Sequence, residues 1–138
     1  MTLADAPRAE AEETPPAIGL AGAVLSVEGL SISVATEAGL RPLVRDLSFS
    51  VGRGQTLAIA GESGSGKSIT ALAMMGLLPE SVRPVAGAVR LGGSDLLRLP
   101  EARLRALRGD RIAMIFQEPM TSLNPIMTVG AQLVEAIR

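Results

Sequence analysis

The octapeptide Gly61-Glu62-Ser63-Gly64-Ser65-Gly66-Lys67-Ser68 decides the fold of this 138-residue chain. It fits the pattern G-x-x-x-x-G-K-[ST], in which backbone N–H groups wrap the phosphates of a nucleotide. Side chains larger than hydrogen at Gly64 and Gly66 would block that approach. An apolar run over residues 56–60 stands directly before the octapeptide, and an apolar helix is predicted after it, over residues 68–78. The motif requires this strand–loop–helix context, which therefore predicts a phosphate-binding loop.

The pattern also predicts the role of each part of this phosphate loop (residues 61–68). Lys67 would reach the β- and γ-phosphates, and the Ser68 hydroxyl would ligate magnesium. The first N–H groups of the following helix, and its dipole, would face the anion. The predicted nucleotide-binding residues are Gly61, Glu62, Ser63, Gly64, Ser65, Gly66, Lys67, Ser68 and Ile69. The predicted cofactors are a nucleoside triphosphate and Mg²⁺.

Composition narrows the possible chemistry. Apolar residues make up 47% of the chain and charged residues 20%, which is typical of a globular domain. The net charge of −1 gives no general electrostatic case for nucleic acid or anionic lipid as partner. The chain contains no cysteine and no histidine, so disulfides, thiolate metal sites and histidine-based catalysis are excluded. Any metal must use oxygen ligands, which suits magnesium.

The pattern of the N-terminal region predicts neither a signal sequence nor a packed helix or strand. Residues 1–22 are rich in Ala, Glu and Pro and lack periodic apolar positions, so we predict a disordered leader, followed by one domain over residues 23–138. The longest apolar stretch, residues 69–78, is far shorter than the roughly 20 residues of a membrane span. Membrane association would therefore go through a partner.

The other predicted elements follow from apolar spacing and turn residues. Residues 56–60 and 111–116 are almost continuously apolar after their first residues, Thr56 and Arg111, which favours strands covered on both faces. Shorter or alternating patterns predict strands over residues 24–27 and 31–34 around a turn at Gly29, over residues 43–44 and 47–51, and over residues 87–93. Helices are predicted over residues 100–108 and from residue 128 or 129 to 138, and the arginines Arg103, Arg105, Arg108 and Arg111 are predicted to form a solvated face. The order of elements indicates an α/β protein.

The motif alone does not distinguish kinases, GTPases, motors and transporters, but a second segment does. The run Ile115-Phe116-Gln117-Glu118-Pro119-Met120-Thr121-Ser122-Leu123-Asn124-Pro125 resembles the Q-loop of ATP-binding cassette (ABC) transporter ATPases. The string from Gln117 to Pro125, and the form of the phosphate loop, look like the subgroup that powers uptake of di- and oligopeptides, nickel and glutathione. The resemblance covers about residues 24–138.

The resemblance implies a fold, an activity and a set of partners. The fold would be the N-terminal part of an ABC-type nucleotide-binding domain, a P-loop NTPase with an antiparallel β subdomain. ATP would be the nucleotide, and its hydrolysis would drive uptake of peptides or peptide-like substrates. Gln117 would join Ser68 in the magnesium shell and help position the attacking water. The expected catalytic residues are thus Gln117 and Lys67, the latter through its contact with the phosphates. Partners would be transmembrane permease subunits, a second nucleotide-binding domain and, indirectly, a substrate-binding protein, which implies a peripheral place on the cytoplasmic side of the inner membrane.

Two departures from the family pattern matter. Val34 stands where the family has an aromatic residue that stacks on adenine, and the chain has no Tyr or Trp. The family's strand ending in Asp-Glu, its Leu-Ser-Gly-Gly signature and its switch histidine are absent from these 138 residues. We therefore expect weak ATP binding and no appreciable turnover by this chain alone.

Two alternatives stay open from the residues. A small-molecule kinase would need an arginine-bearing lid and an acceptor site, and the segment around Gln117 argues against it. A non-catalytic, truncated remnant that binds nucleotide or pairs with a permease without hydrolysis is compatible with the missing motifs.

Overall fold

The computed structural model describes residues 22–117 and 123–137 of the chain. The predicted leader therefore lies outside the described residues except for Gly22. Glu118 and the next four residues of the predicted Q-loop segment also lie outside them.

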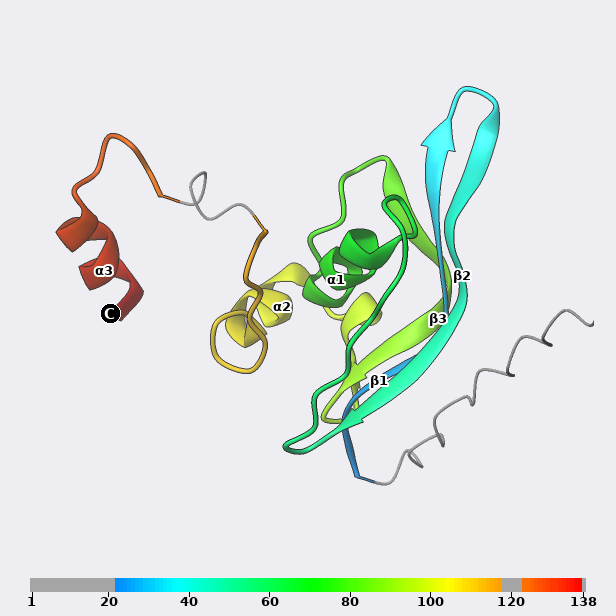
Figure 1. The fold of residues 1–138 in the computed structure, drawn as a ribbon, viewed down its shortest axis with the longest axis horizontal. Helices are drawn as coiled ribbons and strands as arrows, with labels where there is room; N and C mark the ends of the chain where they lie inside the picture. Colours follow the sequence, from blue (N-terminus) through cyan, green and yellow to red (C-terminus); the bar gives the residue numbers. More distant parts are fainter. Residues whose placement is uncertain (1–21, 118–122, 138) are drawn as a thin grey trace, which may run out of the picture.

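The described elements alternate between a β-rich part and short helices (Figure 1). Two long strands, β1 (Ala23–Thr36) and β2 (Gly39–Gly52), form a hairpin that leads into the phosphate loop and helix α1 (Lys67–Met75). Strand β3 (Val82–Leu91), the short strand β4 (Ser94–Asp95) and one 3-10 turn, η1 (Leu96–Arg98), come next. Helix α2 (Glu101–Leu107) and helix α3 (Val129–Ile137) complete the order.

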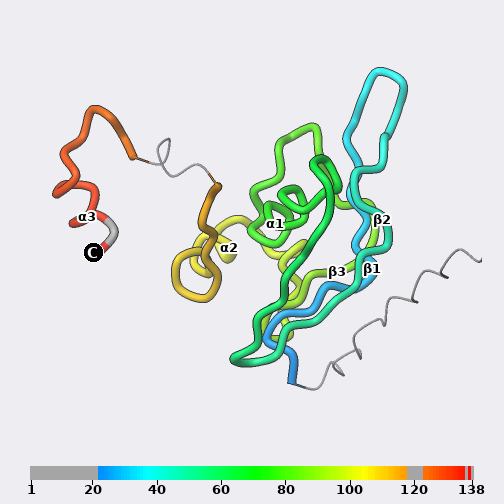
Figure 2. The backbone as a smooth tube through the Cα atoms, in the orientation of Figure 1, coloured from blue at the N-terminus to red at the C-terminus, as the bar shows by residue number. Residues whose placement is uncertain are grey.

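The four strands form one antiparallel sheet in the order β2-β1-β3-β4. Its centre is β1, whose apolar residues oppose apolar residues on both neighbours: Val27 lies opposite Phe49 of β2 and Val89 of β3. The tube in Figure 2 shows β1 and β2 running together and extending as a narrow hairpin beyond Val82, where β3 begins. This sheet is the antiparallel β part that the sequence resemblance implied.

Gly29 forms a bulge inside β1, where the sequence pattern had predicted a turn between two strands. The backbone there has φ +57, and the pairing shifts register on both sides of the strand at this point. A β-bulge adds a residue and bends a strand without ending it. The Gly29 N–H donates to Ser48 Oγ at 2.8 Å, which ties the bulge to β2. One continuous strand results.

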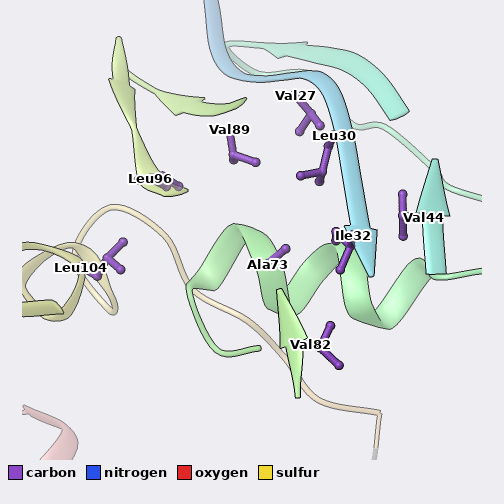
Figure 3. Packing of buried hydrophobic residues seen from close by; sticks show 9 residues of the cluster. All are labelled: Val27, Leu30, Ile32, Val44, Ala73, Val82, Val89, Leu96 and Leu104. Atoms are coloured by element: carbon purple, nitrogen blue, oxygen red, sulfur yellow. The ribbon is translucent and has the colours of Figure 1, made fainter. Parts of the chain in front are cut away.

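The core lies between the sheet and α1. Figure 3 shows the buried side chains of β1 turned toward the helix, where Ala73 meets them. Leu30 and Ile32 have no exposed surface, and Val89 of β3 closes the same layer. The other members of this cluster are Val27, Val44, Val82, Leu96 and Leu104. Because β1 is central and covered by α1, it supplies the most completely buried side chains.

Helix α1 ends three residues before the predicted stop at residue 78. Gly76 has φ +65, and its N–H donates to the carbonyl of Ala73, while the Leu77 N–H donates to that of Leu72. This pair of bonds is the Schellman arrangement, in which a left-handed glycine ends a helix. The glycine, and not Pro79, therefore terminates α1.

Two predicted strands do not form within the described residues. Residues 56–60 have no regular structure and are exposed, with Leu57 and Ile59 each more than 40% accessible. Residues 111–116 make only an isolated parallel bridge between Arg108 and Ile112. A strand exists through hydrogen bonds to a neighbour, and the described sheet places no strand beside either segment. The strand predictions for these two segments, which rested on apolar character alone, were therefore wrong.

Helix α3 forms as predicted and stands apart from the sheet and the other helices in Figure 1. Its apolar residues Val129, Leu133 and Val134 are each at least half exposed. Among the described residues, no helix has the length and apolar character to cross a membrane.

Candidate phosphate-binding site

The phosphate loop turns back on itself and enters α1 through two left-handed glycines. Gly64 has φ +83 and Gly66 has φ +94, conformations that favour glycine. The Ser65 N–H donates to the Glu62 carbonyl at 3.2 Å, which closes a turn around Ser63. The loop predicted from the octapeptide is therefore present, although the strand predicted before it is not.

Gly66 is required for packing as well as for backbone conformation. A Cβ atom at this position would lie 2.8 Å from Cγ2 of Val44 and 3.1 Å from the carbonyl oxygen of Leu43. A Cβ at Gly64 would meet nothing within 4 Å. The sequence pattern attributed both glycines to the approach of a ligand, whereas at Gly66 the fold itself demands the small residue because the loop rests on β2.

Lys67 is the only lysine in the chain, and its ammonium group lies inside the loop. Its Nζ donates to the carbonyl oxygens of Gly61 at 2.7 Å and Glu62 at 2.6 Å, and to Ser65 Oγ at 3.1 Å. All three ammonium donors are thus directed at loop oxygens. This arrangement places one full positive charge within the turn that the motif predicts to hold phosphate.

The N-terminus of α1 adds unpaired donors to this charge. The first N–H groups of a helix have no partner within the helix, and the capping residue Gly66 offers no side chain to take one. The first turn contains no acidic residue. Ser68 is exposed in that turn, and Ile69 packs partly against the core. Helix N–H groups, the helix dipole and the Lys67 ammonium together favour a polyanion.

Thr70 fixes the junction between loop and helix. It is 2% exposed, and its Oγ1–H donates to the Gly66 carbonyl at 2.9 Å. The Thr70 N–H donates to the same carbonyl at 2.8 Å, so one oxygen receives both bonds. The left-handed glycine is thereby anchored to the buried side of α1.

Arg108 holds the opposite end of α1, and its predicted place on a solvated face is wrong. Its Nε donates to the Met75 carbonyl at 2.8 Å and its Nη2 to the Gly76 carbonyl at 3.0 Å. Its Nη1 also donates to Glu101 Oε1 at 2.6 Å, and these hydrogen bonds and the arginine charge hold the pKa of Glu101 below its usual value. The other three arginines of the predicted face, Arg103, Arg105 and Arg111, are exposed. The sequence offered no sign of the difference, because the carbonyls that Arg108 binds lie more than thirty residues earlier.

Within the described residues, no hydrogen bond connects the two predicted magnesium ligands, Ser68 and Gln117. Gln117 is exposed, and no hydrogen bond connects it to the phosphate loop in the described part of the chain. That part also holds no group of three or more Asp, Glu, His or Cys side chains arranged for a metal. A cation at Ser68 would therefore need phosphate and water oxygens as its other ligands, as Mg²⁺ commonly has. The role of Gln117 stays a prediction.

Comparison with known proteins gives one family. A family model described as ABC transporter matches residues 44–136. The oligopeptide transport ATP-binding protein OppD of Escherichia coli K12 is 48% identical over 128 residues, covering 93% of this chain and 38% of OppD. The glutathione import ATP-binding protein GsiA of Shigella flexneri serotype 5b is 52% identical over 124 residues, covering 86% of this chain and 20% of GsiA. The dipeptide transport ATP-binding protein DppD of Bacillus subtilis is 49% identical over 115 residues, covering 83% of this chain and 34% of DppD.

Solved structures give the same fold at lower identity. The dimeric structure of MJ0796, a bacterial ABC transporter cassette, superposes with a TM-score of 0.68 at 22% identity, covering 83% of this chain and 48% of that one. A post-hydrolysis structure of the same cassette bound to ADP and Pi gives a TM-score of 0.61 at 17% identity, covering 82% of this chain and 54% of that one. These identities support likeness of fold alone. This chain spans between a fifth and about two fifths of the length of the transport proteins named above.

Proposed function

Because the chain belongs to the ABC transporter family, we propose that it binds ATP and Mg²⁺ at residues 61–68, as the ATP-binding part of an importer for peptides or peptide-like substrates such as glutathione. The family match and the structural likeness confirm the predicted fold class. The relatives are named for transport of oligopeptides, glutathione and dipeptides, and the cargo class is proposed from that likeness.

One observation carries the nucleotide proposal. The Lys67 ammonium and the first turn of α1, free of any acidic side chain, converge on one loop whose carbonyls hold the ammonium within 2.7 Å. In the proposed complex the N–H groups at the start of α1 bind phosphate oxygens, Lys67 neutralises their charge, and the Ser68 hydroxyl is one oxygen ligand of Mg²⁺. When bound, Mg²⁺ would neutralise part of the negative charge on the phosphate oxygens.

The remaining roles are proposed from the family. Gln117 would contribute an oxygen near Mg²⁺ and orient water, which requires its segment to approach the loop in an assembled transporter. Permease subunits and a second nucleotide-binding domain would be the partners, and a substrate-binding protein would act indirectly. The place of action would be the cytoplasmic face of the inner membrane. We expect no appreciable ATP turnover by the 138-residue chain alone, since it contains no apolar strand ending in paired acids.

Titration calorimetry with Mg·ATP tests the nucleotide site. Lys67→Ala removes a charge-assisted contact worth about 1.5–3 kcal/mol, which corresponds to a ten- to hundredfold loss of affinity. Arg105→Ala is the matched control, because it removes an exposed cation from α2, outside the phosphate loop. Equal ATP affinity in the wild-type chain and the Lys67→Ala variant would refute the site.

The single lysine permits a second, independent measurement. Apart from the N-terminal amine, Lys67 is the only amine that an acylating reagent can label. Bound triphosphate should protect Lys67 from labelling, as read by mass spectrometry, while labelling of the N-terminal amine stays constant. Equal labelling of Lys67 with and without saturating Mg·ATP would contradict the proposal.

A further inference from the structure

The phosphate loop rests against the β1–β2 hairpin at Gly66, so the hairpin borders the proposed nucleotide site. Gly66 lies within contact distance of Leu43 and Val44 on β2. Beyond these residues the hairpin continues to Arg41, level with the start of β3, and then extends past that strand, as Figure 2 shows. A nucleotide whose phosphates sit at the start of α1 therefore has the hairpin as an adjoining surface.

The strand register decides which hairpin side chains lie on the loop's side of the sheet. Val34 of β1 lies opposite Arg41 of β2 and opposite Val82 of β3. Directly opposed residues of an antiparallel pair share one face. Val82 is buried and Val34 packs against the core, so this is the face that α1 and the loop cover. Arg41 therefore projects from the loop's side of the sheet.

The spacing fits the reach of a nucleoside triphosphate. Arg41 lies three residues along β2 from Val44, but a register shift at Leu43 sets these three residues against only two of β1, Ile32 to Val34, or roughly 7 Å at the rise of an extended strand. A triphosphate and ribose are long enough to carry a base over that distance from the loop. Arg41 thus stands where the nucleoside, and not the phosphates, would lie.

The chemistry of this part of the hairpin also suits a base. Arg41 is exposed, and within the described residues no ion pair or hydrogen bond engages its guanidinium. The chain has no Tyr or Trp, and Phe49 lies far along β2, opposite Val27. A guanidinium is planar and stacks on aromatic rings, and the half-buried Val34 beside it offers an apolar floor.

We propose that Arg41 stacks its guanidinium on the base of the bound nucleotide and so contributes to affinity for the nucleoside part. The proposal rests on the proposed nucleotide site at residues 61–68. It makes Arg41 a specificity-determining residue of that site, located on a strand that the phosphate-loop motif does not include.

Calorimetry with two ligands separates base contact from phosphate contact. The 138-residue chain and its Arg41→Ala variant are titrated with Mg·ATP and with magnesium tripolyphosphate, which has no base. Arg41→Ala should weaken ATP binding about two- to fivefold, the range for an exposed cation–π contact, and leave tripolyphosphate binding unchanged. The ATP affinity of Arg41→Lys should lie between those of the wild-type chain and Arg41→Ala, because an ammonium keeps the charge but not the planar group.

Arg83→Ala is the matched control. Arg83 is also an exposed arginine. It lies on β3 opposite Ser33, whose side chain lies on the other face of the sheet from Val34. Its removal should leave both affinities unchanged. Unchanged ATP affinity in Arg41→Ala, equal losses for ATP and tripolyphosphate, or an equal loss in Arg83→Ala would each overturn the assignment.

The same titrations distinguish failure of this inference from failure of the site. If the wild-type chain binds ATP and tripolyphosphate, and Lys67→Ala weakens binding of both ten- to hundredfold, the phosphate site stands whatever Arg41→Ala shows. If the wild-type chain binds neither, both proposals are refuted.

Discussion

The guanidinium of Arg108 donates to Glu101 Oε1 at 2.6 Å and so links the two ends of helix α2. The same guanidinium also binds the end of helix α1. The second contact runs from Nε to the Met75 carbonyl at 2.8 Å, at the C-terminus of α1. Carbonyls of a last helical turn lack partners within the helix, and a cation there interacts favourably with the dipole. Arg108 therefore joins α2 to the helix that begins at the phosphate loop.

Replacing Arg108 with alanine should reduce the free energy of unfolding by about 2 kcal/mol, the range for hydrogen bonds that involve a charged group. The arginine side chain is 19% exposed while Glu101 is 55% exposed, so the loss should come chiefly from the hydrogen bonds to the Met75 and Gly76 carbonyls and not from the ion pair. Urea unfolding measures the change. Arg105→Ala, an exposed position on the same helix, should shift stability by less than about 0.5 kcal/mol. Equal losses in the two variants would contradict the role of Arg108.

The contribution of Glu101 should depend on pH. The hydrogen bonds from Arg108 lower the pKa of Glu101 most strongly, burial opposes that shift, and the charges of Arg108 and Arg105 add to it. A carboxyl whose pKa is lower in the folded state stabilises the protein above its unfolded pKa of about 4.3, and this stabilisation is lost as pH falls through the folded pKa.

The corresponding measurement is urea unfolding of the wild-type chain and Glu101→Gln at pH 7, 5 and 3. The wild-type chain should be the more stable at pH 7, and the difference should diminish toward pH 3, where the carboxyl becomes neutral like the amide. A difference that is constant over this range would show that the charge of Glu101 is not what stabilises the fold.

Alanine at Gly66 should cost more stability than alanine at Gly64. Both positions have positive φ, so each substitution carries about 1–2 kcal/mol of backbone strain. Only at Gly66 would the new methyl group also displace Val44. Thermal unfolding without nucleotide should therefore give Gly66→Ala the lower midpoint. The reverse order would show that the loop does not rest on β2 as described.

Alanine at Gly87 should disrupt the pairing of β1 with β3. Its Cβ would lie 2.5 Å from the carbonyl oxygens of Glu28 and Gly29, and backbone atoms cannot rotate away as a side chain can. Gly92→Ala is the matched control, since Gly92 also has positive φ but an added Cβ would have nothing within 4 Å. Unfolding midpoints by circular dichroism should fall much further for Gly87→Ala. Similar midpoints for the two variants would refute the close approach at the Gly29 bulge.

Local patterns predicted the elements whose hydrogen bonds are local. Helix α1 and the phosphate loop follow from the octapeptide and the apolar run after it, and α3 follows from its spacing. Residues 56–60 were predicted as a strand from apolar character, but strand formation needs a neighbour that the sequence pattern does not contain. Gly29 was assigned to a turn because a glycine between two apolar runs has the same local signature as a bulge.

The sequence by itself determined the phosphate loop, its lysine and the family, because the motif's donors, charge and glycines are neighbours in the chain. The tertiary structure decided the contact of Gly66 with Val44, the attachment of Arg108 to the end of α1 and the shared face of Val34 and Arg41. Each of these depends on strand register or helix packing between segments distant in sequence, and neither composition nor spacing fixes such distances.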